Sequence, residues 1–255
     1  MGTRVALGRD TVPFFQNACQ IGRSTLVSDR IIFSSVRGGG SPNLYAQAAD
    51  GTGTATRLTD SPNPQNPTGI TPDATQVVLN EATPAALADI RLLTMTPTPQ
   101  VKPLVETRFD ERGGVVSPDG RWLAYASNRS GAYEVYVQPF PAVDRGLWPV
   151  STGGGTQPLW ARNGRELFYV APDGALMGMP VEARCSVWSS GPPMRLVEGR
   201  YFSGGEGTTV RQYDVSADGQ RFLMMKEEAR DTNAASSIYV VQNWFEEVKQ
   251  RVPTK

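Results

Sequence analysis

The chain has 255 residues, of which 39% are hydrophobic and 20% are charged, a composition typical of a folded globular protein. Basic and acidic residues number 25 each, so the formal charge is zero and no general field attracts DNA, RNA or anionic lipid. Histidine is absent, which excludes a Ser-His-Asp triad, a Cys-His pair and histidine-ligated zinc, and leaves Asp, Glu, Lys or Tyr for any proton transfer.

A tight turn followed by an apolar strand recurs along the chain. The clearest copy is residues 117–125, with the sequence SPDGRWLAY. Degenerate copies begin at Thr71, Ala161 and Ser216, and residues 29–33 keep the strand without the turn. A repeat of roughly 40–50 residues built from short strands and tight turns is the signature of a β-propeller. Each copy is one blade, which buries its faces by stacking on its neighbours.

The predicted strands follow this repeat in chain order. Residues 9–27 match it poorly and are expected to supply one inner strand. In blades one and two the predicted strands are 31–34, 43–46, 56–59, 77–79, 89–93 and 103–105. In blades three and four they are 114–116, 122–126, 133–137, 147–150, 159–160, 166–170, 176–181 and 194–197. Blade five contains 212–215, 222–225 and 237–241. The spacing of apolar residues then predicts a short amphipathic helix at 243–249.

The fifth blade lacks a fourth strand of its own. Residues 3–7 resemble the outer strand 54–58 of blade one, and we predict that they pair antiparallel with 237–241 and close the ring. The result is an all-β fold: a β-propeller of five four-stranded blades, with six blades or completion by a partner chain as alternatives. The expected boundaries of this single domain are 9–60, 61–107, 108–151, 152–198 and 199–242 plus 2–8, with a helix and tail at 243–255.

The chain offers little that indicates a metal, a cofactor or a membrane. Cys19 and Cys185 are the only cysteines, and their separation fits neither a metal site nor a thioredoxin-like motif. We therefore expect two isolated thiols, no metal and no cofactor. No apolar run approaches the roughly 20 residues that span a bilayer, and residues 1–4 lack the apolar core of a signal peptide. We expect no membrane insertion and no nucleic-acid partner.

Residues 117–137 resemble the WD40-like, or TolB-like, propeller repeats of bacteria. They contain the Ser-Pro-Asp-Gly turn, an apolar strand, the Ser127-Asn128-Arg129 turn and a Glu-Val-Tyr-Val strand. The likeness covers about residues 29–255 and is closest to the carboxyl-terminal sensor propellers of bacterial serine/threonine protein kinases, which have runs similar to 38–45, 151–156 and 243–247. It implies a sensor-type propeller, which in those kinases is extracytoplasmic. No kinase domain is present, because the catalytic His-Arg-Asp loop needs histidine.

Carboxylates recur at the turns, where we predict a structural role. Asp73, Asp119 and Asp218 occupy the same turn position, so their side chains are expected to accept backbone N–H bonds. Departures from the repeat are more informative about function. Asp214 is such a departure, because Gly69, Val115 and Leu159 stand at the equivalent positions on the channel-lining strands.

The remaining candidate residues lie near the predicted channel. Arg211 precedes Asp214 by three residues, and residues 110–112, Asp110-Glu111-Arg112, are expected on a loop that borders the channel mouth. Trp160 adds an aromatic side chain on the inner strand of blade four. Carboxylates and an aromatic platform around a channel suit a sugar or another polar ligand, and a salt bridge between blades is the alternative.

Two functions follow from these residues. The first is a non-enzymatic module that binds a small polar ligand or a protein partner at the channel mouth, with Arg112, Trp160 and Arg211 as ligand contacts, in a monomer or weak oligomer. The second is a carboxylate-based hydrolase, a glycosidase more than an esterase, in which Asp214 acts with Asp110 or Glu111. Such a pair needs carboxyl groups about 5–5.5 Å apart for retention and about 6.5–9.5 Å apart for inversion.

Overall fold

The computed structural model describes residues 21–27 (backbone), 29–84, 87–96, 98–182, 187–197, 201 and 211–225. All of them belong to one compact unit, Val12–Glu227. Apart from a single 3-10 turn at Val143–Arg145, the regular elements in these ranges are β-strands. No helix among the described residues is long and apolar enough to cross a membrane.

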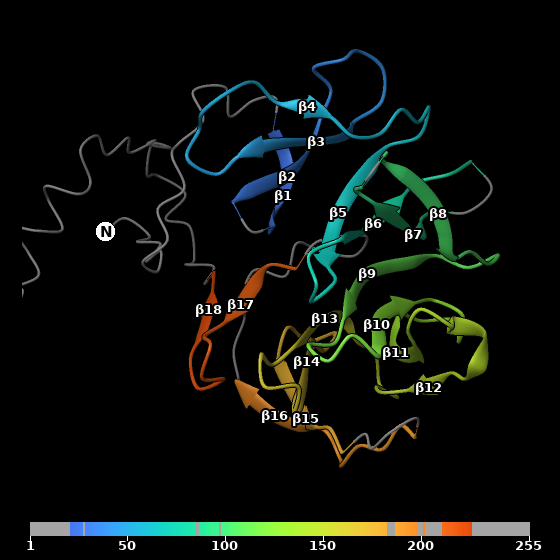
Figure 1. Ribbon diagram of the computed structural model, residues 1–255. Helices are drawn as coiled ribbons and strands as arrows, with labels where there is room; N and C mark the ends of the chain where they lie inside the picture. The colour runs from blue at the N-terminus through green and yellow to red at the C-terminus, as the bar shows by residue number, and fades with distance from the viewer. Residues whose placement is uncertain are drawn as a thin grey trace, which may run out of the picture. The chain divides into compact units, whose positions relative to one another are not determined.

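Four antiparallel sheets of four strands follow one another along the chain (Figure 1). The first contains β1 (Ile21–Val27), β2 (Arg30–Ser35), β3 (Asn43–Ala48) and β4 (Thr56–Arg57). The second contains β5 (Gln65–Ile70), β6 (Gln76–Glu81), β7 (Asp89–Thr94) and β8 (Gln100–Val105). The third contains β9 (Glu111–Val116), β10 (Trp122–Ser127), β11 (Glu134–Pro139) and β12 (Trp148–Pro149). The fourth contains β13 (Thr156–Trp160), β14 (Glu166–Val170), β15 (Leu176–Pro180) and β16 (Met194–Val197). A two-stranded sheet follows, with β17 (Tyr213–Val215) and β18 (Phe222–Met224).

The first strands of successive sheets lie beside one another. β1 contacts β5, β5 contacts β9, and β9 contacts β13. The Tyr213 hydroxyl of β17 donates to the Gln157 carbonyl of β13 at 2.9 Å. Sheets that meander outward from a row of adjacent first strands are the blades of a β-propeller. The five-blade ring stays a prediction, because the closing pair 3–7 with 237–241 and the helix at 243–249 lie outside the described residues.

The repeated turn has the same chemistry in each copy. In the first, Asp73 accepts from the backbone N–H of Thr75 at 3.1 Å and from the Thr71 hydroxyl at 2.6 Å. Equivalent backbone N–H bonds to Asp119 and Asp218 confirm the structural role predicted for these carboxylates, and Asn163 accepts the same bond in its turn. The hydroxyl of Thr71 is the largest cause that lowers the pKa of Asp73. The turn therefore stabilises itself locally, which explains why it can be recognised in sequence.

The hydrophobic core lies between blades. One cluster joins blades one and two, a second joins two and three, a third joins three and four, and a fourth joins blade four to β17 and β18. The third is the richest in aromatic rings, because Trp188 packs edge-on against both Trp122 and Trp160, with ring centroids 5.4 and 5.8 Å apart. Each blade therefore depends on its neighbours for burial of its apolar faces.

The blades place their connections at two ends. Ser34 Oγ of β2 donates to the carbonyl of Gln65, the first residue of β5, at 2.6 Å. Asn80 Nδ2 of β6 donates to the backbone carbonyl of Glu111, the first residue of β9, at 2.8 Å. The ends of the second strands and the starts of the inner strands thus lie together, and we call this the loop end. Among the described residues it carries 36–42, 82–84, 87–88, 106–110 and 128–133. The repeated turns, residues 71–76, 117–122, 161–166 and 216–221, lie at the opposite end, which we call the turn end.

Candidate functional site

Asp110 forms hydrogen bonds that join two loops of the loop end, residues 106–110 and 128–133. Its side chain is only 2% exposed. Arg112 Nε donates to Asp110 Oδ1 at 2.9 Å, and the Arg112 Nη2 and the Tyr133 hydroxyl both donate to Oδ2. The backbone N–H of Asp110 donates to Asn128 Oδ1 at 2.9 Å. Asp110 is therefore a buried carboxylate, paired with Arg112, that holds residues 106–110 against residues 128–133.

The predicted loop 110–112 is in part a strand, since Glu111 and Arg112 belong to β9. The strand extends further toward the amino terminus than the sequence indicated because Gly113 has φ 65, which accommodates an irregularity in the pairing between β9 and β10. Gln157 has φ 57 at the equivalent position of β13, where the pairing with β14 is also irregular. The bulge is thus a feature of both blades.

Glu111 lies in the interior. It is fully buried, and its Oε1 accepts from Thr107 Oγ1 at 2.7 Å and from Ser127 Oγ at 3.2 Å. Its Oε2 has no hydrogen-bond partner among the described residues. Burial raises the pKa of Glu111, opposed by those two hydroxyl bonds, and the nearby Asp89 raises it further. The environment therefore makes Glu111 a weaker acid than an exposed glutamate.

Asp214 lies near the other end of its strand. It is exposed, and its Oδ1 accepts the backbone N–H of Val215 at 2.9 Å. When the inner strands are aligned on their turns, Asp214 is equivalent to Val115, four residues beyond Glu111 toward the turn end. At about 3.3 Å per residue this offset is about 13 Å along the strand direction. The register does not bring Asp214 together with Asp110 or Glu111. Arg211 donates from Nε to the Tyr213 carbonyl at 3.0 Å.

Trp160 is a packing residue in the structure. It is 4% exposed and lies in the core between blades three and four. Its indole Nε1 donates to the Val115 carbonyl at 3.1 Å, which connects β13 to β9. This placement leaves no exposed indole face on which a ligand could stack.

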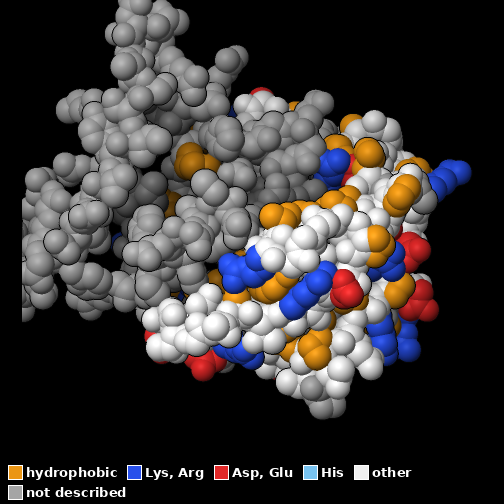
Figure 2. All heavy atoms as spheres, turned by 90° about the horizontal axis from the view of Figure 1, so that it is seen from above, with side chains coloured by type: hydrophobic (Ala, Val, Ile, Leu, Met, Phe, Trp, Pro, Cys, Tyr) orange, Lys and Arg blue, Asp and Glu red, His pale blue; other side chains and the backbone are white. Residues whose placement is uncertain are grey.

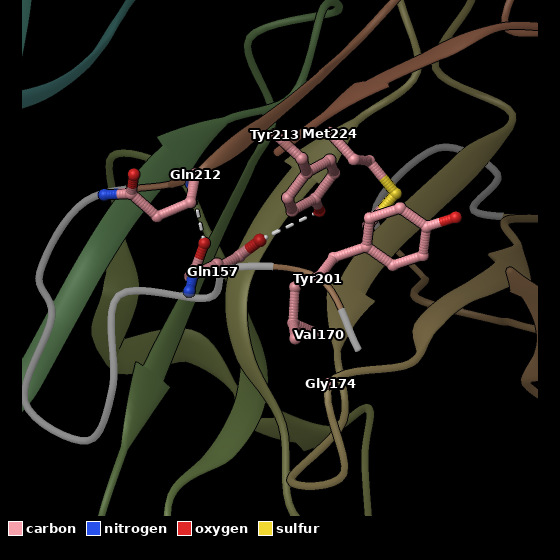
Figure 3. Close-up of a pocket in the computed structure, with 7 residues that line it drawn as sticks. All are labelled: Gln157, Val170, Gly174, Tyr201, Gln212, Tyr213 and Met224. Carbon is pink, nitrogen blue, oxygen red and sulfur yellow. Dashed lines mark hydrogen bonds between the residues drawn. The ribbon is translucent and has the colours of Figure 1, made fainter. Parts of the chain in front are cut away.

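One cavity among the described residues is small. The cavity drawn in Figure 3 lies where β13 and β14 meet β17 and β18, and Gln157, Gln212 and Tyr213 contribute to its lining. Two of these lining residues are hydrogen-bonded to each other: the backbone N–H of Gln212 donates to Gln157 Oε1 at 2.7 Å. The cavity's volume of about 10 Å³ has room for roughly one water molecule. Within the described ranges no group of three or more Asp, Glu or Cys side chains is arranged to hold a metal ion.

Arginines stacked on aromatic rings are the feature that the sequence analysis missed. The Arg108 and Arg129 guanidinium groups lie 5.0 and 5.7 Å from the centre of the Phe109 ring. Arg129 also lies 5.5 Å from the ring of Tyr136. Phe109 is half-buried and Arg108 is exposed, so this group is part of the surface at the loop end. The Ser127-Asn128-Arg129 turn was visible in the sequence, but its stacking partners come from other segments.

Surface charge elsewhere is mixed. The face shown in Figure 2 carries basic and acidic side chains close to one another, with hydrophobic side chains between them. Such a surface fits the formal charge of zero and supplies no broad field of one sign.

The comparisons with known proteins show the fold. No protein-family model matches the sequence, and no curated protein matches it. A structure assigned as TolB from Agrobacterium tumefaciens superposes with a TM-score of 0.54 at 19% identity, over 63% of this chain and 60% of that one. TolB from Acinetobacter baumannii gives a TM-score of 0.54 at 16% identity, over 69% of this chain and 44% of that one. The tricorn protease gives 0.52 at 12% identity, over 71% of this chain and 22% of that one.

The chain is a β-propeller similar in fold to these proteins. It spans less than two thirds of the length of each of them. At such low identity the likeness carries over the fold alone. The resemblance to kinase sensor propellers stays a prediction.

Proposed function

We propose that this chain is a non-catalytic β-propeller module, of sensor type, that binds a protein partner at its loop end. The observation that carries the proposal is the rigid surface around Phe109, in which arginines and aromatic rings are fixed beside one another. Arginine and aromatic side chains are the residue types that contribute most to binding at protein interfaces. We favour a protein partner over a small ligand because Arg108 and Phe109 lie at the surface, and the cavity drawn in Figure 3 has room for roughly one water molecule.

Hydrogen bonds hold two connections of the loop end, residues 106–110 and 128–133, against each other. Besides the bond from the Asp110 N–H to Asn128 Oδ1, the N–H of Asn128 donates to the carbonyl of Asp110. Tyr133 and Arg112 hold the buried Asp110 carboxylate from a second side. A surface already fixed in its bound geometry loses less conformational entropy on association. This supports a binding role for the residues that these contacts display.

The carboxylate hydrolase has less support. Glu111 is fully buried, the Asp110 charge is neutralised by Arg112, and Asp214 lies about 13 Å further along the strand direction. That offset exceeds the separation of about 9.5 Å at the upper limit for an inverting pair. No observation on the described residues favours this second function.

Two experiments test the proposal. The first is a panel of chromogenic glycosides and esters, with the purified chain compared with its Asp214→Asn and Glu111→Gln variants. We expect equal background rates for all three proteins. Steady turnover that one of these substitutions abolishes would overturn the non-catalytic assignment.

The second experiment locates the binding surface. A photo-reactive benzoylphenylalanine replaces Phe109 at the loop end or, as a matched control, Arg162 at the turn end, and each protein is irradiated in an extract of the source cells. We expect a discrete cross-linked protein from position 109 and none from position 162. Cross-linking from position 162 alone would place the binding surface at the turn end and contradict the proposal.

A further inference from the structure

The stacked arginine of blade three has a counterpart in blade one. Arg37 and Arg129 each follow a serine by two positions, at the end of the second strand of the blade. In both, the backbone N–H of the arginine donates to that serine hydroxyl, at 3.2 Å for Arg37 and 3.3 Å for Arg129. The Arg37 guanidinium lies 4.9 Å from the ring of Phe33 and 5.3 Å from the ring of Tyr45.

The aromatic partners repeat as well. Tyr45 and Tyr136 are both the third residue of the third strand of their blades. The loop end therefore presents an arginine over an equivalent tyrosine in two blades, with Arg108 added beside the second one. We call Arg37, Arg108 and Arg129 the arginine face.

The charge of Arg129 acts on the buried Glu111, where it opposes the rise in the pKa of that carboxyl, but no member of the arginine face is held in an ion pair among the described residues. None of its three guanidinium groups forms a salt bridge with any residue that the structure describes. By contrast, the exposed carboxylates at this end are already paired: Asp60 with Arg57 at 2.6 Å, Glu106 with Arg91 at 2.8 Å and Asp173 with Arg195 at 2.6 Å. The buried Asp110 is held by Arg112. The arginine face therefore gathers guanidinium groups that form no salt bridge within the described part of the loop end; Arg211, whose Nε donates to the Tyr213 carbonyl, forms none either.

Stacking also prepares these groups for an anion. A guanidinium lying over an aromatic ring keeps its N–H groups at the ring edge free to donate, and its planar fork matches a carboxylate. Charge-assisted bonds from arginine to carboxylate are about twice as strong as neutral ones. The rings fix the side chains in advance, so less rotamer entropy is lost on binding.

We propose that the arginine face binds an acidic segment of the protein partner, through Asp or Glu side chains of that segment. This inference rests on the proposed function and specifies the chemistry of the partner. Positive charge confined to a few fixed arginines on a molecule of zero formal charge selects a local acidic segment rather than a long polyanion, which needs a continuous basic surface.

The test uses a fluorescein-labelled octaglutamate peptide and fluorescence anisotropy with the full chain. The arginine-face variant combines Arg37→Gln, Arg108→Gln and Arg129→Gln. Its matched control combines Arg145→Gln, Arg162→Gln and Arg165→Gln, three exposed arginines at the turn end without a salt bridge among the described residues. Both variants lose the same charge, so the comparison isolates position from net charge. Thermal unfolding of both confirms that they fold.

We expect the arginine-face variant to bind the peptide about 30-fold more weakly, from a loss of about threefold for each exposed contact. The control should change by less than about twofold, and binding by the unsubstituted chain should weaken as salt is raised. Equal losses in both variants, or no loss in the arginine-face variant, would overturn the proposal. Labelled single-stranded DNA or phosphatidylserine vesicles bound more tightly than the peptide, with the same dependence on these arginines, would overturn it as well.

The cross-link from position 109 separates this inference from the proposed function. A partner that cross-links there and is displaced by octaglutamate supports both. A partner that cross-links there and is not displaced refutes the acidic segment and leaves the proposed function standing. Cross-linking from position 162 alone refutes both.

Discussion

Replacing Trp160 by phenylalanine tests whether this side chain holds blades three and four together. The substitution removes the indole N–H that donates to the buried Val115 carbonyl at 3.1 Å. An unpaired buried carbonyl costs about 1–3 kcal/mol. The smaller ring also weakens the edge contact with Trp188, now at 5.8 Å, which is worth about 0.5–1.5 kcal/mol. We therefore expect a loss of about 2–4 kcal/mol in the free energy of unfolding.

Thermal and urea unfolding measure this loss. For a chain of this size it corresponds to a fall in Tm of about 5–15 °C. Leu147→Ala, which changes a residue that is 36% exposed, is the control and should cost less than about 0.5 kcal/mol. If Trp160→Phe keeps the Tm of the unsubstituted chain while abolishing binding of a ligand, the side chain is a ligand platform and the packing argument is wrong.

Three further predictions address acid–base behaviour, backbone strain and closure. Burial raises the pKa of Glu111 above 4.5, so the folded state favours the neutral acid, and this contribution to stability is lost as the pH rises through the folded-state pKa. Glu111→Gln should flatten that part of the curve of unfolding free energy against pH, and an unchanged slope would contradict the assignment. Ala74 has φ 58 at a turn position that Gly120, Gly164 and Gly219 occupy elsewhere, so Ala74→Gly should raise the free energy of unfolding by up to about 1 kcal/mol and the urea midpoint with it; a lower midpoint would show that the backbone there is unstrained. Deleting residues 1–8 should lower the Tm by many degrees or cause association through an uncovered strand edge, because we predict that residues 3–7 complete the last blade. A monomer of unchanged Tm after this deletion would show that the ring closes in another way.

Local chemistry explains why much of the fold could be predicted. The Ser-Pro-Asp-Gly turn satisfies its own hydrogen bonds within six residues, as at Asp119, where the Arg121 N–H donates to Oδ1 at 3.2 Å. The strand that follows was predicted at 122–126 and is observed at Trp122–Ser127. Inner strands were predicted too short, because the bulges at Gly113 and Gln157 extend β9 and β13 past the point where alternation of apolar residues ends.

The candidate site was harder to predict because it depends on contacts between blades. The sequence gives no measure of which face of an inner strand meets the next blade, so Trp160 and Glu111 were expected at the channel and are buried between blades. Arg129 lies over the ring of Phe109, although Phe109 is in the loop before β9 and Arg129 is in the loop after β10. Such a contact is decided by the packing of complete blades, and no local pattern records it.

Equivalent positions at the loop end carry different residue types in successive blades. The third residue of the third strand is Tyr45 in blade one, Arg91 in blade two and Tyr136 in blade three. In blade two the cation is thus in the strand, where Arg91 pairs with Glu81 at 3.1 Å and Glu106 at 2.8 Å and is neutralised within the fold. In blades one and three the cation is in the connection, lies over the tyrosine and forms no salt bridge with a described residue. Blades one and three therefore each present an arginine over a tyrosine at the loop end, whereas in blade two a single arginine, Arg91, lies against the three carboxylates of Glu81, Asp89 and Glu106.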